Sequence, residues 1–216
     1  PDWTGGISNT FSYRSLSLSF LIDASVGGSI FSNTNKTGKY TGVLANTLSG
    51  RDAEHGGLWY YTAAMGNNVR LPESPSYSVS SDGLYYAQVN GQSTRVYQDG
   101  IMVEGVTESG SKNEEVVSAE KYYHRIYSIA EANVYDASYV KLREVALSYR
   151  LPRLWTQKLH LQEASVTLTG RNLWTIYKSV PNIDPESALT TGNAQGVEAY
   201  SLPTTRSFGV NLSVKF

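Results

Sequence analysis

The sequence predicts an all-β fold made of long antiparallel strands. Apolar side chains alternate with Ser, Thr, Gly and Asn along five stretches of about 9 to 14 residues, longer than the common strand length of about 5–6 residues. Because successive side chains of a strand point to opposite faces, each stretch has one apolar and one polar face. Short and long connections also alternate along the chain. These observations are typical of a membrane-spanning antiparallel β-barrel, whose strands face lipid on one side and a hydrated interior on the other.

The first two strands are predicted over residues 5–13 and 15–26. Ile7, Phe11 and Tyr13 mark the apolar face of the first, and the second begins with "LSLSFLI", in which apolar residues alternate with serines. The alternation changes phase between the two runs. This change predicts a tight hairpin at Arg14–Ser15.

Three further strands are predicted over residues 138–150, 164–177 and 205–216. The first half of the 138–150 strand fits the alternation less well, because it contains Lys141 and Arg143. The last strand alternates to the end of the sequence, although chain termini usually fray. We expect its apolar residues to face lipid: Phe208, Val210, Leu212, Val214 and Phe216.

The connections at 14–15 and 152–163 are short, whereas those at 27–137 and 178–204 are long. In an antiparallel order this places the short connections at one end of the strands and the long ones at the other, as in outer-membrane barrels, where the long loops are extracellular. A soluble β-sandwich remains an alternative, because its strands also alternate.

The 27–137 connection is too long for an unstructured loop. Asn90-Gly91 and Asp99-Gly100 each suit a type I′ turn between strand-like runs, so a three-stranded meander is predicted there. The run "SAEKYYHRIYSIAEA" predicts a short helix with Ser118 as its N-cap.

Composition excludes several classes of function. Lys and Arg number 18 against 19 Asp and Glu, with no basic run, so no nucleic-acid partner is expected. The absence of cysteine excludes disulfides and thiolate chemistry. No stretch approaches about 18 consecutive apolar residues, which argues against a transmembrane helix. The start "PDWTGG" has neither Met nor a signal-peptide pattern, and indicates a mature, processed or truncated chain.

The sequence contains no motif that predicts an enzyme, a metal site or a cofactor. His55, His124 and His160 lie far apart without a zinc-binding spacing. The acidic pairs Asp52/Glu54 and Asp184/Glu186 are expected in solvated loops, since nothing holds their members face to face as glycosidase chemistry requires.

The stretch "GGLWYYTAA" is the most suggestive binding motif. Trp59, Tyr60 and Tyr61 on a loop could stack on sugar rings or peptide side chains. The alternative is that they pack the core of the loop or contact a partner protein.

Several segments together resemble the C-terminal quarter of SusC/RagA-like TonB-dependent outer-membrane transporters. They are, in order, "PDWTGGISNTFSYRSLSLSFLIDASVGGSIFS", "GIMVEGVTESGSKNEEVVSAEKYY", "DASYVKLREVALSYRLP", "VTLTGRNLWTIYK", "NIDPES" and "LPTTRSFGVNLSVKF". The resemblance covers nearly the whole chain, with the plug domain absent.

The resemblance implies a 22-stranded barrel, of which this chain would supply the last five strands. It implies import of glycans or peptides across the Gram-negative outer membrane, together with a SusD-like surface lipoprotein, and with TonB bound by a segment outside this chain. It also implies a homodimer of transporter–lipoprotein pairs, a loop-shaping role for "DPE" at 184–186, and recognition of Phe216 and the apolar positions before it by the assembly machinery. Rival hypotheses are a barrel that binds or adheres without transport, and a soluble β-sandwich lectin.

Overall fold

The computed structural model describes residues 1–72, 74–158, 160–187, 192 and 195–216. The chain divides into two compact units, the first formed by Pro1–Thr34 with Val134–Phe216 and the second by Asn35–Asn133. Helix α1 (Asn33–Thr41) contains the boundary between them. Residues 188–191, 193 and 194 of the predicted 178–204 loop lie outside the described residues.

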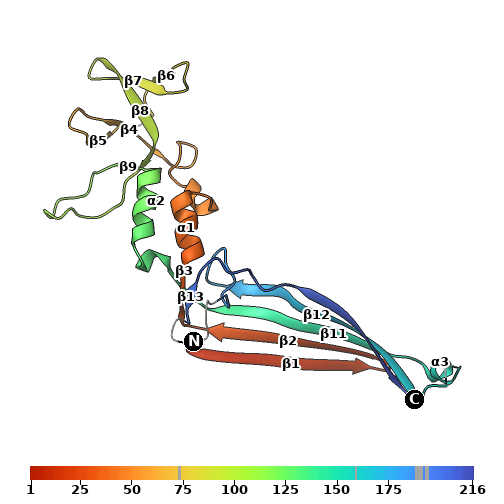
Figure 1. Ribbon diagram of the computed structural model, residues 1–216. Coiled ribbons are helices and arrows are strands. Elements are labelled where there is room, and N and C mark those ends of the chain that lie inside the picture. Colours follow the sequence, from red (N-terminus) through yellow and green to blue (C-terminus); the bar gives the residue numbers. More distant parts are fainter. Residues whose placement is uncertain (73, 159, 188–191, 193–194) are drawn as a thin grey trace. The chain divides into compact units, whose positions relative to one another are not determined.

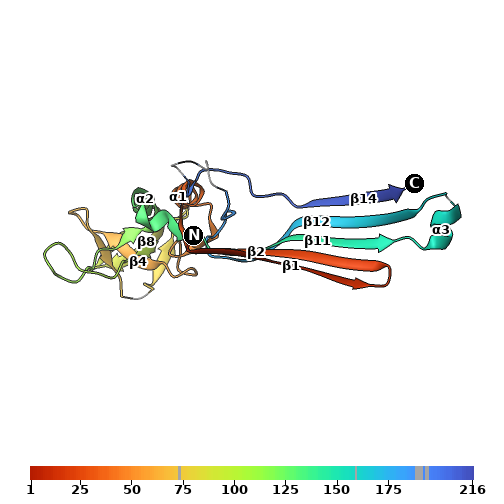
Figure 2. The same cartoon turned by 90° about the horizontal axis from the view of Figure 1, so that it is seen from below.

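A five-stranded antiparallel sheet dominates the first unit, with strand order β1-β2-β11-β12-β14 (Figures 1 and 2). Its strands are β1 (Trp3–Tyr13), β2 (Leu16–Val26), β11 (Tyr139–Arg150), β12 (Glu163–Lys178) and β14 (Ser207–Lys215). Each bound lies within two residues of the range expected from the sequence. Within the described residues the sheet is open, with β1 and β14 as its edges.

The β1–β2 hairpin turns at Arg14 and Ser15, as predicted. Tyr13 pairs with Leu16 across it, and Arg14 adopts a left-handed φ of 55°. Helix α3 (Arg153–Lys158) occupies the short connection between β11 and β12.

A small sheet completes the first unit, with order β10-β3-β13. Its strands are β3 (Ser29–Ser32), β10 (Val134–Asp136) and β13 (Val197–Glu198). Ile30 packs with Val180 and Ile183 in the buried apolar cluster of this unit.

The second unit contains a mixed set of short strands and helices. Its main sheet has the order β5-β4-β8-β7-β6, with β9 paired to β8. The elements are η1 (Ala45–Leu48), β4 (Leu58–Thr62), β5 (Asn68–Arg70), β6 (Tyr77–Val79), β7 (Tyr85–Val89), β8 (Gln92–Ile101), β9 (Val117–Ser118), α2 (Ala119–Ser128) and η2 (Glu131–Asn133).

Two local predictions in this unit are confirmed. Asn90 and Gly91 both have positive φ and join β7 to β8, as a type I′ turn requires. The Ser118 side chain accepts a hydrogen bond from the Lys121 backbone nitrogen and caps α2.

The predicted turn at Asp99-Gly100 is wrong, because both residues lie within β8. Gly100 pairs with Leu58 of β4, and a Cβ atom built on Gly100 would stand 2.5 Å from the Leu58 carbonyl oxygen. The glycine therefore permits the close approach of two strands. A three-stranded meander is present but lies earlier in the sequence than predicted, because it consists of β6, β7 and β8. Its turns lie at residues 80–84 and at Asn90-Gly91, and β4 pairs with the end of β8 where the second turn was predicted.

Candidate functional site

The two faces of the five-stranded sheet carry different side chains. Paired residues on neighbouring strands lie on the same face, so the register defines rows that cross all five strands. One row is Phe11, Leu18, Leu147, Leu168 and Val210. The adjacent row on the same face is Tyr13, Leu16, Tyr149, Val166 and Leu212. We call this the apolar face.

The opposite face carries small polar residues in the same register. One of its rows is Ser12, Ser17, Ser148, Thr167 and Asn211. The next is Thr10, Ser19, Ala146, Thr169 and Gly209. Hydroxyl groups hydrogen-bond along these rows, for example Ser148 and Thr167 at 2.8 Å. We call this the polar face.

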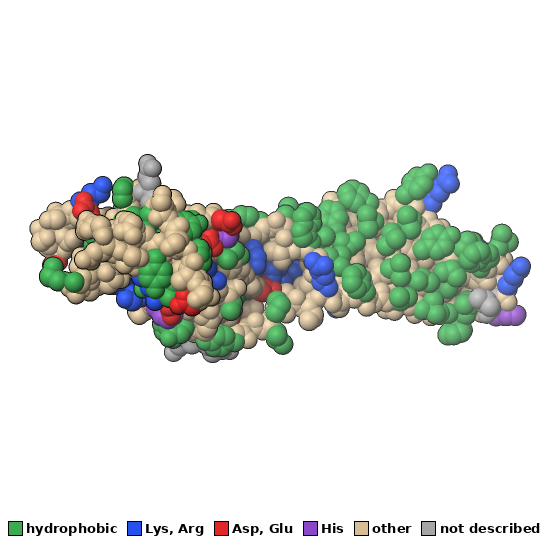
Figure 3. Space-filling view, turned by 90° about the horizontal axis from the view of Figure 1, so that it is seen from above, with side chains coloured by type: hydrophobic (Ala, Val, Ile, Leu, Met, Phe, Trp, Pro, Cys, Tyr) green, Lys and Arg blue, Asp and Glu red, His purple; other side chains and the backbone are tan. Residues whose placement is uncertain are grey.

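The apolar face is uncovered within this chain. Every member of the first apolar row is at least 38% exposed, and Val210 is 74% exposed. Figure 3 shows hydrophobic side chains gathered over the strands of the sheet, at the right of the view. Soluble monomeric proteins rarely expose continuous apolar patches of this kind. The face therefore suits an apolar environment.

A bulge changes the phase of β11 at Arg143. The register of β11 shifts between Leu142 and Glu144 against both neighbouring strands. On β12 the shift coincides with Asn172, which has a left-handed φ of 51°. An extra residue sends the side chains beyond it to the other face. Lys141 and Arg143 break the alternation of the sequence, and the bulge explains why. It places Lys141 on the polar face and not on the apolar face.

Lys141 lies on the polar face, where it pairs in register with Asp23 of β2. Its ammonium group donates to the Asp184 Oδ1 atom at 2.5 Å and to the Glu186 Oε2 atom at 2.6 Å. Arg143 donates to Asp23 at 2.7 Å and also bonds both carboxylate oxygens of Glu186. Only 4% of the Lys141 side chain and 8% of the Asp184 side chain are exposed. We call these five residues the ionic cluster.

The ionic cluster extends to the segment that precedes β14. The Asp184 Oδ2 atom accepts from the Thr204 hydroxyl at 2.5 Å and from the Thr204 backbone nitrogen at 3.2 Å. The Tyr139 hydroxyl donates to Glu186 at 2.9 Å. The expectation of a solvated loop is wrong for Asp184, whose side chain is 8% exposed and binds a strand cation more than forty residues earlier in the sequence. Glu186 remains an exposed residue, although strand cations bind its carboxylate as well.

The cluster keeps both loop carboxylates ionised. Burial by itself raises the pKa of Asp184, but hydrogen bonds from Lys141 and Thr204 outweigh burial and lower this pKa to about 2. Burial likewise raises the pKa of Glu186, whereas hydrogen bonds from Arg143 and Lys141 lower it to about 2. The network is thus structural in character, with its charges paired.

A second buried carboxylate, Glu198 on β13, is held by neutral donors. It accepts from the Ser32 hydroxyl at 2.7 Å and from the Thr34 hydroxyl at 2.6 Å. Burial raises its pKa, and the bonds from Thr34 and Ser32 bring this pKa below its usual value. No sequence pattern indicated this site.

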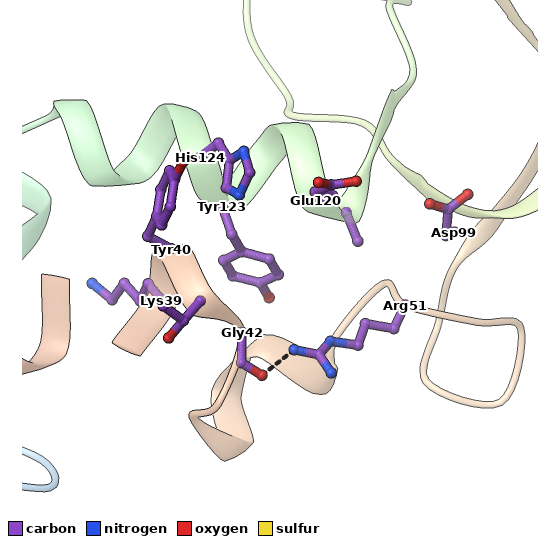
Figure 4. Close-up of a pocket in the computed structure, with 10 residues that line it drawn as sticks. Lys39, Tyr40, Gly42, Arg51, Asp99, Glu120, Tyr123 and His124 are labelled. Atoms are coloured by element: carbon purple, nitrogen blue, oxygen red, sulfur yellow. Dashed lines mark hydrogen bonds between the residues drawn. The ribbon is translucent and has the colours of Figure 1, made fainter. Parts of the chain in front are cut away.

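The second unit contains a cavity of about 410 Å³ beside α1 and α2 (Figure 4). It is lined by Lys39, Tyr40, Thr41, Gly42, Arg51, Asp99, Ala119, Glu120, Tyr123 and His124. The rings of Tyr40 and His124 are stacked, with centroids 4.1 Å apart. Arg51 bonds the Gly42 carbonyl oxygen, and donates to the Thr47 hydroxyl at 2.8 Å.

Asp99 lines this cavity and has a raised pKa. Burial raises its pKa, a hydrogen bond from the Tyr60 hydroxyl at 3.2 Å lowers it, and the charge of Glu120 raises it again. The cavity therefore combines aromatic rings with charges of both signs. Such a lining can hold a polar organic molecule by stacking and hydrogen bonding.

Two of the three aromatic residues of the "GGLWYYTAA" stretch are buried. Trp59 is 6% and Tyr60 is 4% exposed. Trp59 packs in a cluster with Ala87 and Val96, while Tyr61 is partly buried against the same cluster. This packing favours the alternative that the stretch forms the core of its region. Contact of Trp59, Tyr60 or Tyr61 with a ligand or partner remains a prediction.

The histidines and acidic residues singled out in the sequence do not form a metal site among the described residues. His55 and Asp52 hydrogen-bond to each other at 2.7 Å on the surface. The part of the chain that the structure describes contains no group of three or more metal-ligating side chains, and none of its helices is long and apolar enough to cross a membrane.

Comparison with known proteins gives one curated relative. No protein-family model matches the chain. TonB-dependent receptor P3 of Formosa agariphila is 34% identical over 94 residues, which make up 41% of this chain and 9% of that receptor.

Among solved structures, the chain is similar to chains of the RagAB peptide importer in the open-open and closed-closed states. Each match covers 99% of this chain and 17% of the other, with 17% identity and a TM-score of 0.47. The chain thus spans a small part of the length of the proteins it matches. The relationship to receptor P3 supports the resemblance of this chain to a part of a SusC/RagA-like TonB-dependent receptor.

Proposed function

We propose that the five-stranded sheet is part of the membrane-spanning wall of an outer-membrane β-barrel that imports nutrients with energy supplied through TonB. The two-faced register of the sheet carries this proposal. Its apolar face is exposed in rows of Phe, Leu, Val and Tyr, and its polar face carries Ser, Thr and Asn. A barrel wall needs this division, because one face meets lipid and the other meets water.

The free edges of the sheet support closure by strands outside this chain. The edge strands β1 and β14 are each paired on one side only, within the described residues. Unpaired backbone groups are not viable in lipid, and five strands cannot close around an interior. We propose that other strands of the same receptor complete a barrel of 22 strands, with the connections 27–137 and 178–204 on the extracellular side.

The proposed activity is uptake of glycans or peptides at the Gram-negative outer membrane. The relative is named a TonB-dependent receptor, and the RagAB structures are described as a peptide importer. We propose a SusD-like surface lipoprotein as partner and TonB contact through a segment outside this chain. A homodimer of such pairs completes the proposed assembly. An adhesion barrel without transport would share the wall but not the uptake.

Spin labels in the intact receptor, reconstituted in lipid vesicles, test the proposed wall. Labels at Val210 and Leu212 should be relaxed by oxygen, which concentrates in lipid, and shielded from a water-soluble nickel chelate. A label at Asn211, between them on the polar face, is the matched control and should show the opposite preference. Access of the nickel chelate to Val210 and Leu212 would contradict the barrel and favour a soluble sheet.

Uptake needs a separate test, since a wall can exist without transport. Cells that carry the intact receptor should accumulate labelled oligosaccharides or peptides only when TonB is present. Binding at the surface without TonB-dependent accumulation would favour the adhesion barrel.

A further inference from the structure

The register of the last strand requires an anchor outside the strand itself. β14 pairs with β12 on one side, and all nine of its residues are exposed. A slip by one residue would exchange its two faces, which the apolar pattern opposes. A slip by two residues keeps every apolar residue on the apolar face. The alternation alone therefore leaves registers two residues apart nearly equivalent.

The connection to β14 does not remove this ambiguity by its length. Tight hairpins fix register through the turn, as Arg14 and Ser15 do between β1 and β2. Residues 179–206 separate β12 from β14, and a chain of this length reaches several registers with little difference in closure entropy.

Two side chains hold the residues immediately before β14. Asp184 accepts hydrogen bonds from the hydroxyl and the backbone nitrogen of Thr204. The Asn172 side-chain amide donates to the Thr205 carbonyl oxygen at 3.2 Å. Both contacts lie within three residues of Ser207, where β14 begins.

Each of these two side chains is itself held in position. Asp184 is fixed by the buried Lys141 ammonium at 2.5 Å. Asn172 stands at the β12 bulge with a left-handed φ of 51°, where an asparagine is tolerated far better than most residues. The bulge and the ionic cluster thus present an acceptor and a donor to two consecutive residues of the chain.

We infer that Asp184 and Asn172 form a register clamp, which selects the pairing of β14 with β12 by holding Thr204 and Thr205. Lys141 is a positioning residue in this clamp, since it acts on β14 through Asp184. The clamp goes beyond the proposed transport function, because it concerns which of several apolar-compatible pairings the last strand adopts.

Disulfide trapping in the intact receptor measures the register directly. Thr167 of β12 pairs with Asn211 of β14, and paired residues have Cα atoms about 4.5–5.5 Å apart, within disulfide range. The pair Thr167→Cys/Asn211→Cys reports the observed register. The pairs Thr167→Cys/Gly209→Cys and Thr167→Cys/Ser213→Cys report slips by two residues. This chain contains no cysteine, and cysteines elsewhere in the receptor are replaced first.

The clamp variant is Asn172→Gly/Thr204→Val. Glycine accepts the left-handed backbone at 172, and valine removes the Thr204 hydroxyl while Asp184 keeps its bond to Lys141. We expect the ratio of observed-register to slipped disulfide to fall about tenfold, because two hydrogen bonds are lost.

Glu144→Gln is the matched control. Glu144 pairs with Arg171 at 2.8 Å on β11 and β12. Arg171 adjoins Asn172 in the sequence, but in the described structure neither the Glu144 nor the Arg171 side chain hydrogen-bonds Asn172, Asp184, Thr204 or Thr205, so this ratio should be unchanged. A clamp variant whose ratio equals that of the control overturns the inference. If the double variant fails to accumulate, Asn172→Gly and Thr204→Val are measured as single variants. Disulfide ratios equal to that of Glu144→Gln in both single variants also overturn the inference. Lipid exposure at Val210 is read separately, so failure of the clamp is distinguishable from failure of the barrel.

Discussion

The five-stranded sheet and the region Asn35–Asn133 differ in where their apolar side chains lie. In the region Asn35–Asn133, Trp59, Ala87 and Val96 form a buried apolar cluster. In the sheet the apolar rows are exposed, while Lys141 is 3% exposed. A region with a buried aromatic cluster and a sheet with exposed apolar rows are adapted to two different surroundings. Water suits the first region, and an apolar solvent on one face suits the sheet.

Replacing Lys141 tests whether the sheet depends on its buried charges. In Lys141→Met, the Asp184 side chain stays buried without its cation, and removal of one partner of a buried pair costs about 3–5 kcal/mol. We expect the opening free energy of β11 and β12, measured by hydrogen exchange in the intact receptor, to fall by that amount. Glu144→Gln removes an exposed ion pair and should cost at most about 1 kcal/mol. Equal effects of the two variants would show that the cluster is not buried.

Replacing Trp59 tests whether the region Asn35–Asn133 depends on its buried apolar cluster. Truncation of a buried Trp costs about 3–5 kcal/mol. Trp59→Ala should therefore speed hydrogen exchange in β4, β7 and β8, and leave β11 and β12 unchanged. An exposed ligand-stacking Trp59 would show little change in exchange, and would instead lose ligand binding.

An arginine on each face of β14 tests the assignment of solvents to faces. Leu212→Arg should destabilise the receptor in a bilayer by about 2–4 kcal/mol if Leu212 lies near the midplane. Asn211→Arg puts the same side chain on the polar face and should cost much less. Urea titration of the receptor folded into lipid vesicles measures both. Similar costs for the two variants would mean that lipid contacts neither face selectively.

The sheet is readable from the sequence because its pattern is local. Alternation over Leu16–Val26 and a phase change at Arg14–Ser15 need no distant partner to be recognised. The cap of α2 at Ser118 is local in the same way. Such features follow from a few consecutive residues.

The sites were less predictable because their partners are distant in sequence. From the sequence, Asp184 is expected to be a solvated loop residue. In the structure the bulge at Arg143 places Lys141 on the polar face, where it binds Asp184. The one available signal was the poor fit of two cations to a strand pattern. Similarly, Asp99-Gly100 has turn chemistry, but the approach of the Leu58 carbonyl oxygen, which only the fold reveals, gives Gly100 its role.

Acid should affect the two regions in opposite directions. Asp184 and Glu186 have folded pKa values of about 2, below their ordinary values of 3.8 and 4.5, because cationic and hydroxyl donors outweigh burial. Groups with a lowered pKa stabilise the fold above their ordinary pKa, and this contribution is lost as the pH falls toward about 2. The sheet should therefore be insensitive to pH between neutral and the ordinary carboxyl range, and weaken below that range.

Asp99 in the region Asn35–Asn133 has the opposite linkage. Its pKa is raised by burial and by the charge of Glu120, so the folded form binds the proton more tightly than the unfolded form. Acidification from neutral pH toward its pKa should stabilise this region, and the gain should reverse as the pH rises again. Hydrogen exchange in the intact receptor, corrected for the intrinsic pH dependence of exchange, separates the regions. Glu186→Gln should reduce the acid response of β11, and Asp99→Asn should abolish the Asp99-dependent response of β4 and β8. A single acid response shared by both regions would contradict the separate ionic environments on which the comparison depends.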